Sequence, residues 1–325
     1  MQRRHLLTAA AVMGSCLLPW QVQAQEAASW PSKPVRMLVG SAPGGGTDAM
    51  ARAVADRLAP LLKQPVLVEN RPGVSNTMAV DVTAKSTDGH TMVMGVVTAH
   101  AIAPHLLKLG YDNNRDLVPV AFVGSVPNVL VVGNSVPANT VAELVAMAKK
   151  NPGRINFASS GTGSTQHIAA EVFKDAAGIE LTHVPYKGSS AALVDLVSGQ
   201  VQMSFDTMPS VIGQIKAGKL RALAVTSPQR NAQLPQVPSM AEAGLPSVEI
   251  SAWYGIYMPA STPKAVQQKV HDEVNKVIAM AETKTRLEAV GAELRPMSQA
   301  DFAAFHLAEY QRFGDIIRKN NIKLD

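Results

Sequence analysis

The sequence predicts a two-domain α/β protein in which each domain contains a doubly wound sheet. Short apolar runs of strand length alternate with longer segments in which apolar residues recur every three or four positions, a pattern typical of parallel sheets covered by helices. This alternation starts near residue 35 and starts again near residue 129. With 325 residues, 46% of them apolar, the chain can build two separate cores.

The first 24 residues have the pattern of a cleaved signal peptide, and we exclude them from the fold. Arg3 and Arg4 make a basic start, and residues 6–18 are apolar but too few for a comfortable membrane span. Small residues at Val22 and Ala24 suit signal peptidase, so we expect export and cleavage near Ala24/Gln25. A buried N-terminal helix is the alternative.

Charge and cysteine content exclude several classes of function. The formal charge of +5 becomes +3 once the two leader arginines are removed, and the basic residues are scattered, so nucleic-acid binding is not indicated. Cys16 is the one cysteine and lies in the leader. We therefore expect no disulfide, no thiol nucleophile and no thiolate metal site in the mature chain.

The first half of the chain predicts a β-α-β-α-β unit. Strands are expected at residues 35–39, 66–70 and 91–97, with helices at 49–62 and 76–85 between them. The segments between the strands are long enough for right-handed crossovers, so we expect parallel strands.

The second half repeats this order and then returns to the first domain. Strands are expected at 129–132, 155–158, 181–184, 201–205 and 220–225, alternating with helices that include 141–149, 165–177 and 190–197. An extended crossing at 250–258 precedes helices at 263–280, 283–290 and 299–319. We therefore expect a discontinuous first domain (25–128 and 252–325) around an inserted second domain (129–251).

A glycine-rich turn follows the strand at 35–39 and opens a helix. It comprises Pro43, Gly44, Gly45, Gly46, Thr47 and Asp48. Thr47 or Asp48 can cap the helix. Free N–H groups and the helix dipole favour an anion there, and glycines let it approach the backbone. The turn suits a carboxylate or phosphate, although a tight connection that binds nothing fits equally. The spacing excludes the dinucleotide fingerprint and the P-loop.

A second turn of this kind follows the strand at 155–158, and it is rich in hydroxyl groups. It contains Ser159, Ser160, Gly161, Thr162 and Ser164. Hydroxyl groups can donate to an anion or accept from an amine, although a capped turn explains the same residues. Because ligands bind beyond the carboxyl ends of strands in α/β sheets, two such turns in facing domains would share one cleft.

Further polar residues end other strands. They are Thr98, His100, Tyr186, Lys187, Gly188 and Asp206. Asp206 could accept a hydrogen bond from a ligand ammonium or hydroxyl group, or cap the next helix. Lys187 could supply charge to an anion or be an ordinary exposed lysine, and His100 could be structural.

Segments along nearly the whole mature chain resemble Bug-type proteins, the periplasmic solute-binding family of tripartite tricarboxylate transporters. They include residues 30–36 (WPSKPVR), 42–48 (APGGGTD), 68–73 (VENRPG), 158–161 (ASSG) and 184–188 (VPYKG). The resemblance implies a clamshell of the type II periplasmic-binding-protein kind with a ligand cleft between the lobes. It also implies that the turns at 43–48, 159–164 and 186–188 and Asp206 surround the ligand, and that Asp48 orders the first turn.

The resemblance implies a function without chemistry. The chain would capture a di- or tricarboxylate, an acidic amino acid or an aromatic acid by lobe closure. It would deliver that ligand to the inner-membrane permease subunits of a tripartite transporter. We expect a periplasmic monomer with no cofactor and no metal.

Two other functions were weighed against this one. An exported serine hydrolase would use a serine such as Ser164, but neither G-x-S-x-G nor S-x-x-K occurs, and His167 only one helical turn away makes no evident triad. A metal-binding receptor is disfavoured because the eight histidines are dispersed without ligand spacing.

Overall fold

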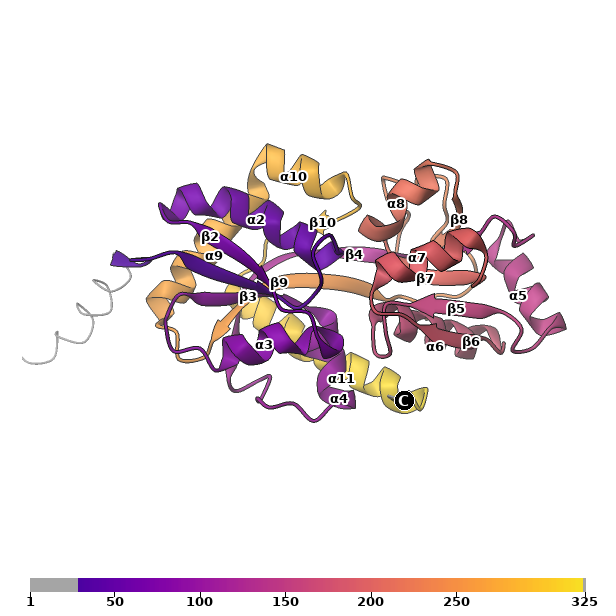
Figure 1. Ribbon diagram of the computed structural model, residues 1–325, viewed down its shortest axis with the longest axis horizontal. Coiled ribbons are helices and arrows are strands. Elements are labelled where there is room, and N and C mark those ends of the chain that lie inside the picture. The colour runs from indigo at the N-terminus through magenta and orange to yellow at the C-terminus, as the bar shows by residue number, and fades with distance from the viewer. Residues whose placement is uncertain (1–28, 324–325) are drawn as a thin grey trace, which may run out of the picture.

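Two lobes, each with a β-sheet covered by helices, lie side by side in the computed structural model, which describes residues 29–323 (Figure 1). The lobe on the left of Figure 1 contains the first and last parts of the described chain, and the other lobe contains the middle. The predicted leader lies outside the described residues. Among the helices of residues 29–323, none has the length and apolar character needed to cross a bilayer.

The sheet of the first lobe mixes parallel and antiparallel strands. Its order is β2 (Val66–Asn70), β1 (Val35–Val39), β3 (Thr91–Val96), β9 (Ser251–Pro259) and β4 (Leu117–Gly133), with β10 (Glu293–Leu294) pairing with β4. β1 runs parallel to β2 and β3, as predicted, whereas β9 runs antiparallel to β3 and β4. β9 therefore brings the late part of the chain back into the first sheet, which confirms the predicted extended return.

Helices from both ends of the chain cover this sheet. They are α2 (Gly46–Leu62), α3 (Thr77–Ala84), α4 (Ala103–Leu106), α9 (Lys264–Ala279), α10 (Ala281–Glu288) and α11 (Gln299–Lys319), with short turns η1 (Val74–Asn76) and η2 (Thr98–Ile102). In α2, the apolar face expected from helical spacing is fully buried at Met50, Val54 and Leu58, whereas Leu61 at its end is half-buried.

The sheet of the second lobe is built around the other end of β4. β4 lies between β8 (Leu220–Val225) and β7 (Met203–Thr207), followed by β5 (Asn156–Ser159) and β6 (Thr182–Pro185). β5 is parallel to both β6 and β7. The helices of this lobe are α5 (Val141–Lys150), α6 (Thr165–Ala177), α7 (Ser189–Ser198) and α8 (Met208–Lys216).

Buried polar contacts join the two places where the chain passes between the lobes. β4 pairs with β9 up to Pro127 and with β7 from Asn128 onward. Asn128 Nδ2 and Thr226 Oγ1 both donate to the carbonyl oxygen of Ile250, at 3.3 and 2.6 Å. The two crossings are thereby tied together, and the lobes share one backbone junction.

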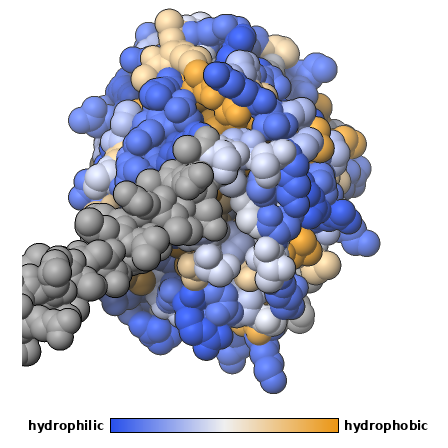
Figure 2. Space-filling view, turned by 90° about the vertical axis from the view of Figure 1, so that its left-hand side faces the viewer, coloured by the Kyte–Doolittle hydropathy of each residue, from blue (hydrophilic) through white to orange (hydrophobic). Residues whose placement is uncertain are grey.

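Polar groups dominate the end of the first lobe that Figure 2 presents. Most of that surface is hydrophilic, with smaller hydrophobic areas between. Most of the large aromatic side chains lie inside instead, among them Trp253, Tyr257 and Phe302, which are at most 1% exposed.

Two predicted boundaries were wrong. The strand expected at 129–132 is only the end of β4, which begins at Leu117. Two prolines and Gly124 interrupt the apolar pattern of β4, and the register shifts near Pro119 and Gly124. The helix expected from residue 49 begins at Gly46, with the extended Gly45 as its N-cap, so Gly46, Thr47 and Asp48 belong to its first turn.

Candidate functional site

The glycine turn after β1 is held in shape by a single buried carboxylate. Asp48, 4% exposed, accepts from the backbone N–H of Gly44 at 2.9 Å, from Asn70 Nδ2 at 2.9 Å and from Arg52 Nε at 3.0 Å. Burial acts to raise the pKa of Asp48, but these hydrogen bonds outweigh it and the pKa is lowered. Asp48 therefore stays ionised and orders the turn, and its oxygens are occupied.

The helix after this turn has no side-chain cap. Its N-cap is Gly45, and no side-chain oxygen accepts at the cap, so the prediction that Thr47 or Asp48 is the N-cap was wrong. Gly44 adopts φ +82°, a backbone conformation that favours glycine. The first N–H groups of α2, a helix of 17 residues, have no acceptor within the helix, so this end of the first lobe offers N–H donors.

The serine turn after β5 uses two of its hydroxyl groups internally. Ser159 Oγ is 2.7 Å from His183 Nε2, and it accepts from the N–H of Gly161. Ser164 is the N-cap of α6 and accepts from the N–H of His167. Both serines are buried, so they shape the turn. The half-buried Ser160 and Thr162 are the hydroxyl groups that remain nearer the surface.

A polar cluster lies at the carboxyl ends of the second-lobe strands. We define it as Ser160, Gln166, Ser189, Asp206 and Thr207. Ser160 Oγ donates to Gln166 Oε1 at 2.9 Å, and Gln166 Nε2 donates to Asp206 Oδ1 at 3.0 Å. Ser189 Oγ and the N–H of Thr207 also donate to Asp206 Oδ1, at 2.9 and 2.7 Å. The cluster thus joins the turns after β5, β6 and β7.

The glycine turn of the first lobe meets this cluster. A Cβ atom on Gly46 would lie 3.3 Å from the hydroxyl of Tyr254 and 3.7 Å from Thr207 Oγ1. Tyr254, on β9, is 2% exposed, and its pKa is raised by burial and by the charge of Asp206, against a hydrogen bond with Thr47. The N-terminus of α2 and the polar cluster therefore face each other across the junction of the lobes.

The remaining predicted residues fall into two groups. Tyr186 lies beside the serine turn, where its hydroxyl donates to Asp195 Oδ2 at 2.6 Å, and this hydrogen bond and burial raise its pKa to about 12. Gly188, at φ +110°, opens α7, and Lys187 beside it is exposed.

Thr98 and His100 lie inside the first lobe instead. The His100 ring is fully buried, stacks on Tyr257 with ring centroids 3.8 Å apart, and contacts Asn113 Oδ1 at 2.8 Å. Burial, with a contribution from His306, lowers the pKa of His100 to about 3. The ring is a neutral packing group, so we leave Thr98 and His100 out of the proposed site.

Sequence reasoning missed four residues of this junction: Gln166, Ser189, Thr207 and Tyr254. Gln166 and Ser189 each lie within two residues of a predicted turn residue, so extending the turns into the first helical turn would have found them. Tyr254 gave no such signal, because it lies in an apolar run that reads as core.

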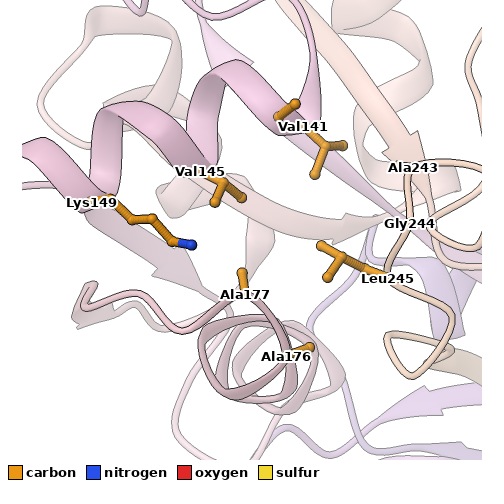
Figure 3. Close-up of a pocket in the computed structure, with 9 residues that line it drawn as sticks. Val141, Val145, Lys149, Ala176, Ala177, Ala243, Gly244 and Leu245 are labelled. Atoms are coloured by element: carbon orange, nitrogen blue, oxygen red, sulfur yellow. The ribbon is translucent and has the colours of Figure 1, made fainter.

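Two other hollows lie in the second lobe and near the junction, and the second of them is lined by charged as well as apolar side chains, among them Arg295, Glu309 and Arg312. One, of about 280 Å³, lies between α5, α6 and residues 243–245 and is lined mainly by aliphatic side chains, with Lys149 at its edge (Figure 3). The other, of about 430 Å³, lies between β4, β9 and α11. Within residues 29–323, no group of three histidine, cysteine, aspartate or glutamate side chains is placed to hold a metal ion.

Comparison with known proteins gives the context for this geometry. Residues 50–322 match the sequence profile of the tripartite tricarboxylate transporter family receptor. Protein BugT of Bordetella pertussis is 35% identical over 299 residues, which cover 91% of this chain and 92% of BugT.

Solved structures of two similar proteins contain dicarboxylates. R. palustris Rpa4515 with adipate has a TM-score of 0.85 and 33% identity, covering 91% of this chain and 100% of that one. MatC from Rhodopseudomonas palustris with bound malate has a TM-score of 0.83 and 30% identity, covering 89% of this chain and 100% of that one.

Proposed function

Because the chain belongs to the receptor family of tripartite tricarboxylate transporters, we propose that it captures a small carboxylate between its lobes and passes it, unaltered, to the membrane subunits of such a transporter. The matched proteins are solute receptors, so the chain is a binding protein and not an enzyme. Adipate and malate in two of the similar structures support a dicarboxylate as the ligand.

One observation carries the proposal: the N-terminus of α2 faces the polar cluster across the junction of the lobes. A helix N-terminus offers N–H donors and a favourable dipole to a carboxylate. Each charge-assisted hydrogen bond contributes about 1.5–3 kcal/mol net, so three or four can support micromolar binding, about −8 kcal/mol.

The residues that we propose contact the ligand come from both lobes. They are Pro43, Gly44, Gly45, Gly46, Thr47 and Tyr254 from the first lobe, and Ser160, Gly161, Thr162, Tyr186, Lys187, Gly188, Gln166, Ser189, Asp206 and Thr207 from the second. We propose that Asp48, Ser159 and Ser164 do not contact the ligand themselves, because their side chains form hydrogen bonds that hold the turns in shape.

The setting of the protein completes the proposal. Proteins of this family work in the periplasm, and we propose a monomer released from its leader near Ala24 that engages inner-membrane permease subunits. We further propose that the lobes divide after residue 128 and before residue 252. The contacts of Asn128 and Thr226 with Ile250 support this division.

Isothermal calorimetry of the mature protein tests the function. The panel is adipate, malate, citrate, glutamate and benzoate, with thermal melting measured in parallel. A true ligand at 100 times its Kd should stabilise the fold by about 2.7 kcal/mol. If no member of the panel releases heat or raises the melting temperature, the proposed ligand class is wrong. Turnover of small esters by the same preparation would instead support the hydrolase alternative.

A further inference from the structure

The two carboxyl oxygens of Asp206 have very different surroundings. Oδ1 accepts three hydrogen bonds, from Gln166, Ser189 and Thr207. Oδ2 has no hydrogen-bond partner among the described residues, although the side chain is only 1% exposed. A buried oxygen without a partner is uncommon and costs free energy, so its position suggests a partner that arrives from outside.

The three donors to Oδ1 are all neutral, so none of them compensates a negative charge on Asp206. The elements packed around it carry several ionisable side chains, among them Asp48 on α2, His167 on α6, Lys187 and Asp195 before and within α7, Lys216 on α8 and Tyr254 on β9. Asp48 binds Arg52, and Asp195 binds Tyr186. Of the cationic side chains, His167 lies beside Glu171, Lys216 donates to Gln233, and Lys187 is exposed. An ionised Asp206 would thus be a buried charge without a cationic partner, which is costly.

The direction of the pKa shift agrees with this geometry. Burial raises the pKa of Asp206, and the hydrogen bonds from Gln166, Ser189 and Thr207 oppose that rise without cancelling it. A ligand carboxylate placed nearby would raise the pKa further, because two adjacent negative charges disfavour each other.

We propose that Asp206 binds the ligand as a neutral acid, with its Oδ2–H donating to a carboxylate oxygen, so that capture takes up one proton. The proton comes from solution and stays on Oδ2, and no bond of the ligand changes. This inference rests on the proposed function, since it needs a carboxylate between the lobes. An acidic pH would therefore favour loading, and a rise in pH would favour release.

Lobe movement has to precede this contact. Oδ2 is enclosed in the present arrangement, with Gly46 and Tyr254 on the first-lobe side of Thr207. A ligand reaches Oδ2 only when the glycine turn moves away from the polar cluster. Closure then removes both acid groups from water, which strengthens the hydrogen bond between them.

Two substitutions of Asp206 and one control test the proposal. Asp206→Asn keeps an acceptor at Oδ1 and places an N–H donor where the Oδ2–H would be, whereas Asp206→Ala removes both. Glu180→Gln is the control, because it neutralises an exposed carboxylate of the same lobe, between α6 and β6. Circular dichroism and melting curves show whether each variant folds.

Calorimetry with adipate, or with malate if adipate does not bind, is run from pH 6.0 to 8.5 in phosphate and in Tris. We expect the wild-type Kd to rise with pH, by up to tenfold per unit, and the buffer comparison to report uptake approaching one proton. Asp206→Asn should bind within about fivefold of wild type at pH 6.0, with a flat profile. Asp206→Ala should bind at least tenfold more weakly, and Glu180→Gln should behave as wild type.

Other outcomes overturn the inference in recognisable ways. A flat wild-type profile without proton uptake refutes it. If Asp206→Asn also binds more than a hundredfold more weakly, Asp206 is instead an ionised acceptor for a ligand hydroxyl or ammonium group. The wild-type proton count decides the matter even if a variant does not fold. If wild type binds no acid of the panel, the proposed function fails, whereas binding without proton uptake removes only this inference.

Discussion

Replacing Gly46 with alanine should separate closure of the lobes from folding. Gly46 is the first residue of α2, and its φ is outside the left-handed region, so alanine suits the backbone. The added methyl group would lie 3.3 Å from the Tyr254 hydroxyl, tighter than nearly all real contacts, and 3.7 Å from Thr207 Oγ1. Gly46 and Tyr254 belong to the same lobe, so the Tyr254 hydroxyl must shift by a few tenths of an ångström, whereas the contact with Thr207 Oγ1 of the other lobe stays at ordinary van der Waals distance.

We expect this crowding to displace the Tyr254 hydroxyl at the junction and to cost about 1–3 kcal/mol of ligand binding, typical of an overpacked contact. Since 1.4 kcal/mol is a factor of ten, Kd should rise roughly 5- to 150-fold in calorimetry with adipate or malate. The melting temperature without ligand should change little, because the higher helix propensity of alanine over glycine offsets part of the crowding.

Gly213→Ala is the matched control. Gly213 lies inside α8, its added Cβ would have no neighbour within 4 Å, and the same gain in helix propensity applies. It should leave Kd unchanged. If Gly46→Ala binds as tightly as wild type while Gly213→Ala does too, the glycine turn does not lie where the lobes close on the ligand.

Three further predictions follow from single contacts. The Asn231 side-chain amide donates to the carbonyl oxygen of Gly291 at 3.3 Å and so joins the second lobe to the first. Asn231→Ala removes this hydrogen bond, and Kd should rise about 2- to 12-fold. An unchanged Kd would contradict a role of this contact in closure. Asp48→Asn should weaken binding and lower the melting temperature at pH 7 but not at pH 2. The reason is that a carboxylate with a lowered pKa stabilises the fold only while it is ionised. If the melting temperature of the variant differs from wild type equally at both pH values, the charge of Asp48 is not the source of the stabilisation. Burial lowers the pKa of His100 to about 3 and that of His306 to about 4, so both are neutral in the fold but protonate near pH 6.5 when the chain unfolds. In urea unfolding, the free energy of unfolding should therefore fall by about 1.4 kcal/mol per histidine for each pH unit below pH 6.5. A flat profile between pH 6.5 and 5 would contradict this.

The sequence predicted the alternating strands and helices well, because period and turn residues encode them locally. The stripe of Met50, Val54 and Leu58 in α2 is an example, since helical spacing alone identifies its buried face. β4 was predicted poorly, because its prolines are tolerated only at register shifts that depend on the partner strand β9. The local pattern of apolar residues does not specify which distant strands pair.

The site divides in the same way. The turns around Gly45 and Gly161 could be located, since glycine and hydroxyl residues mark strand ends. Which turn residues face the junction could not be predicted, because it depends on hydrogen bonds between turns. Ser159 forms a hydrogen bond with His183, whereas Ser160 donates to Gln166 within the polar cluster. Tyr254 enters through the pairing of β9 with β3, which no local signal specifies.

The shared strand β4 also bears on how the molecule comes apart. It supplies an inner strand to both sheets, paired with β9 in one and with β7 and β8 in the other. If one lobe unfolded alone, β4 would lose its hydrogen-bonding partners in that lobe while it still formed part of the sheet of the other lobe. Differential scanning calorimetry should therefore show one cooperative endotherm. Each lobe expressed as a separate fragment should fail to fold stably on its own.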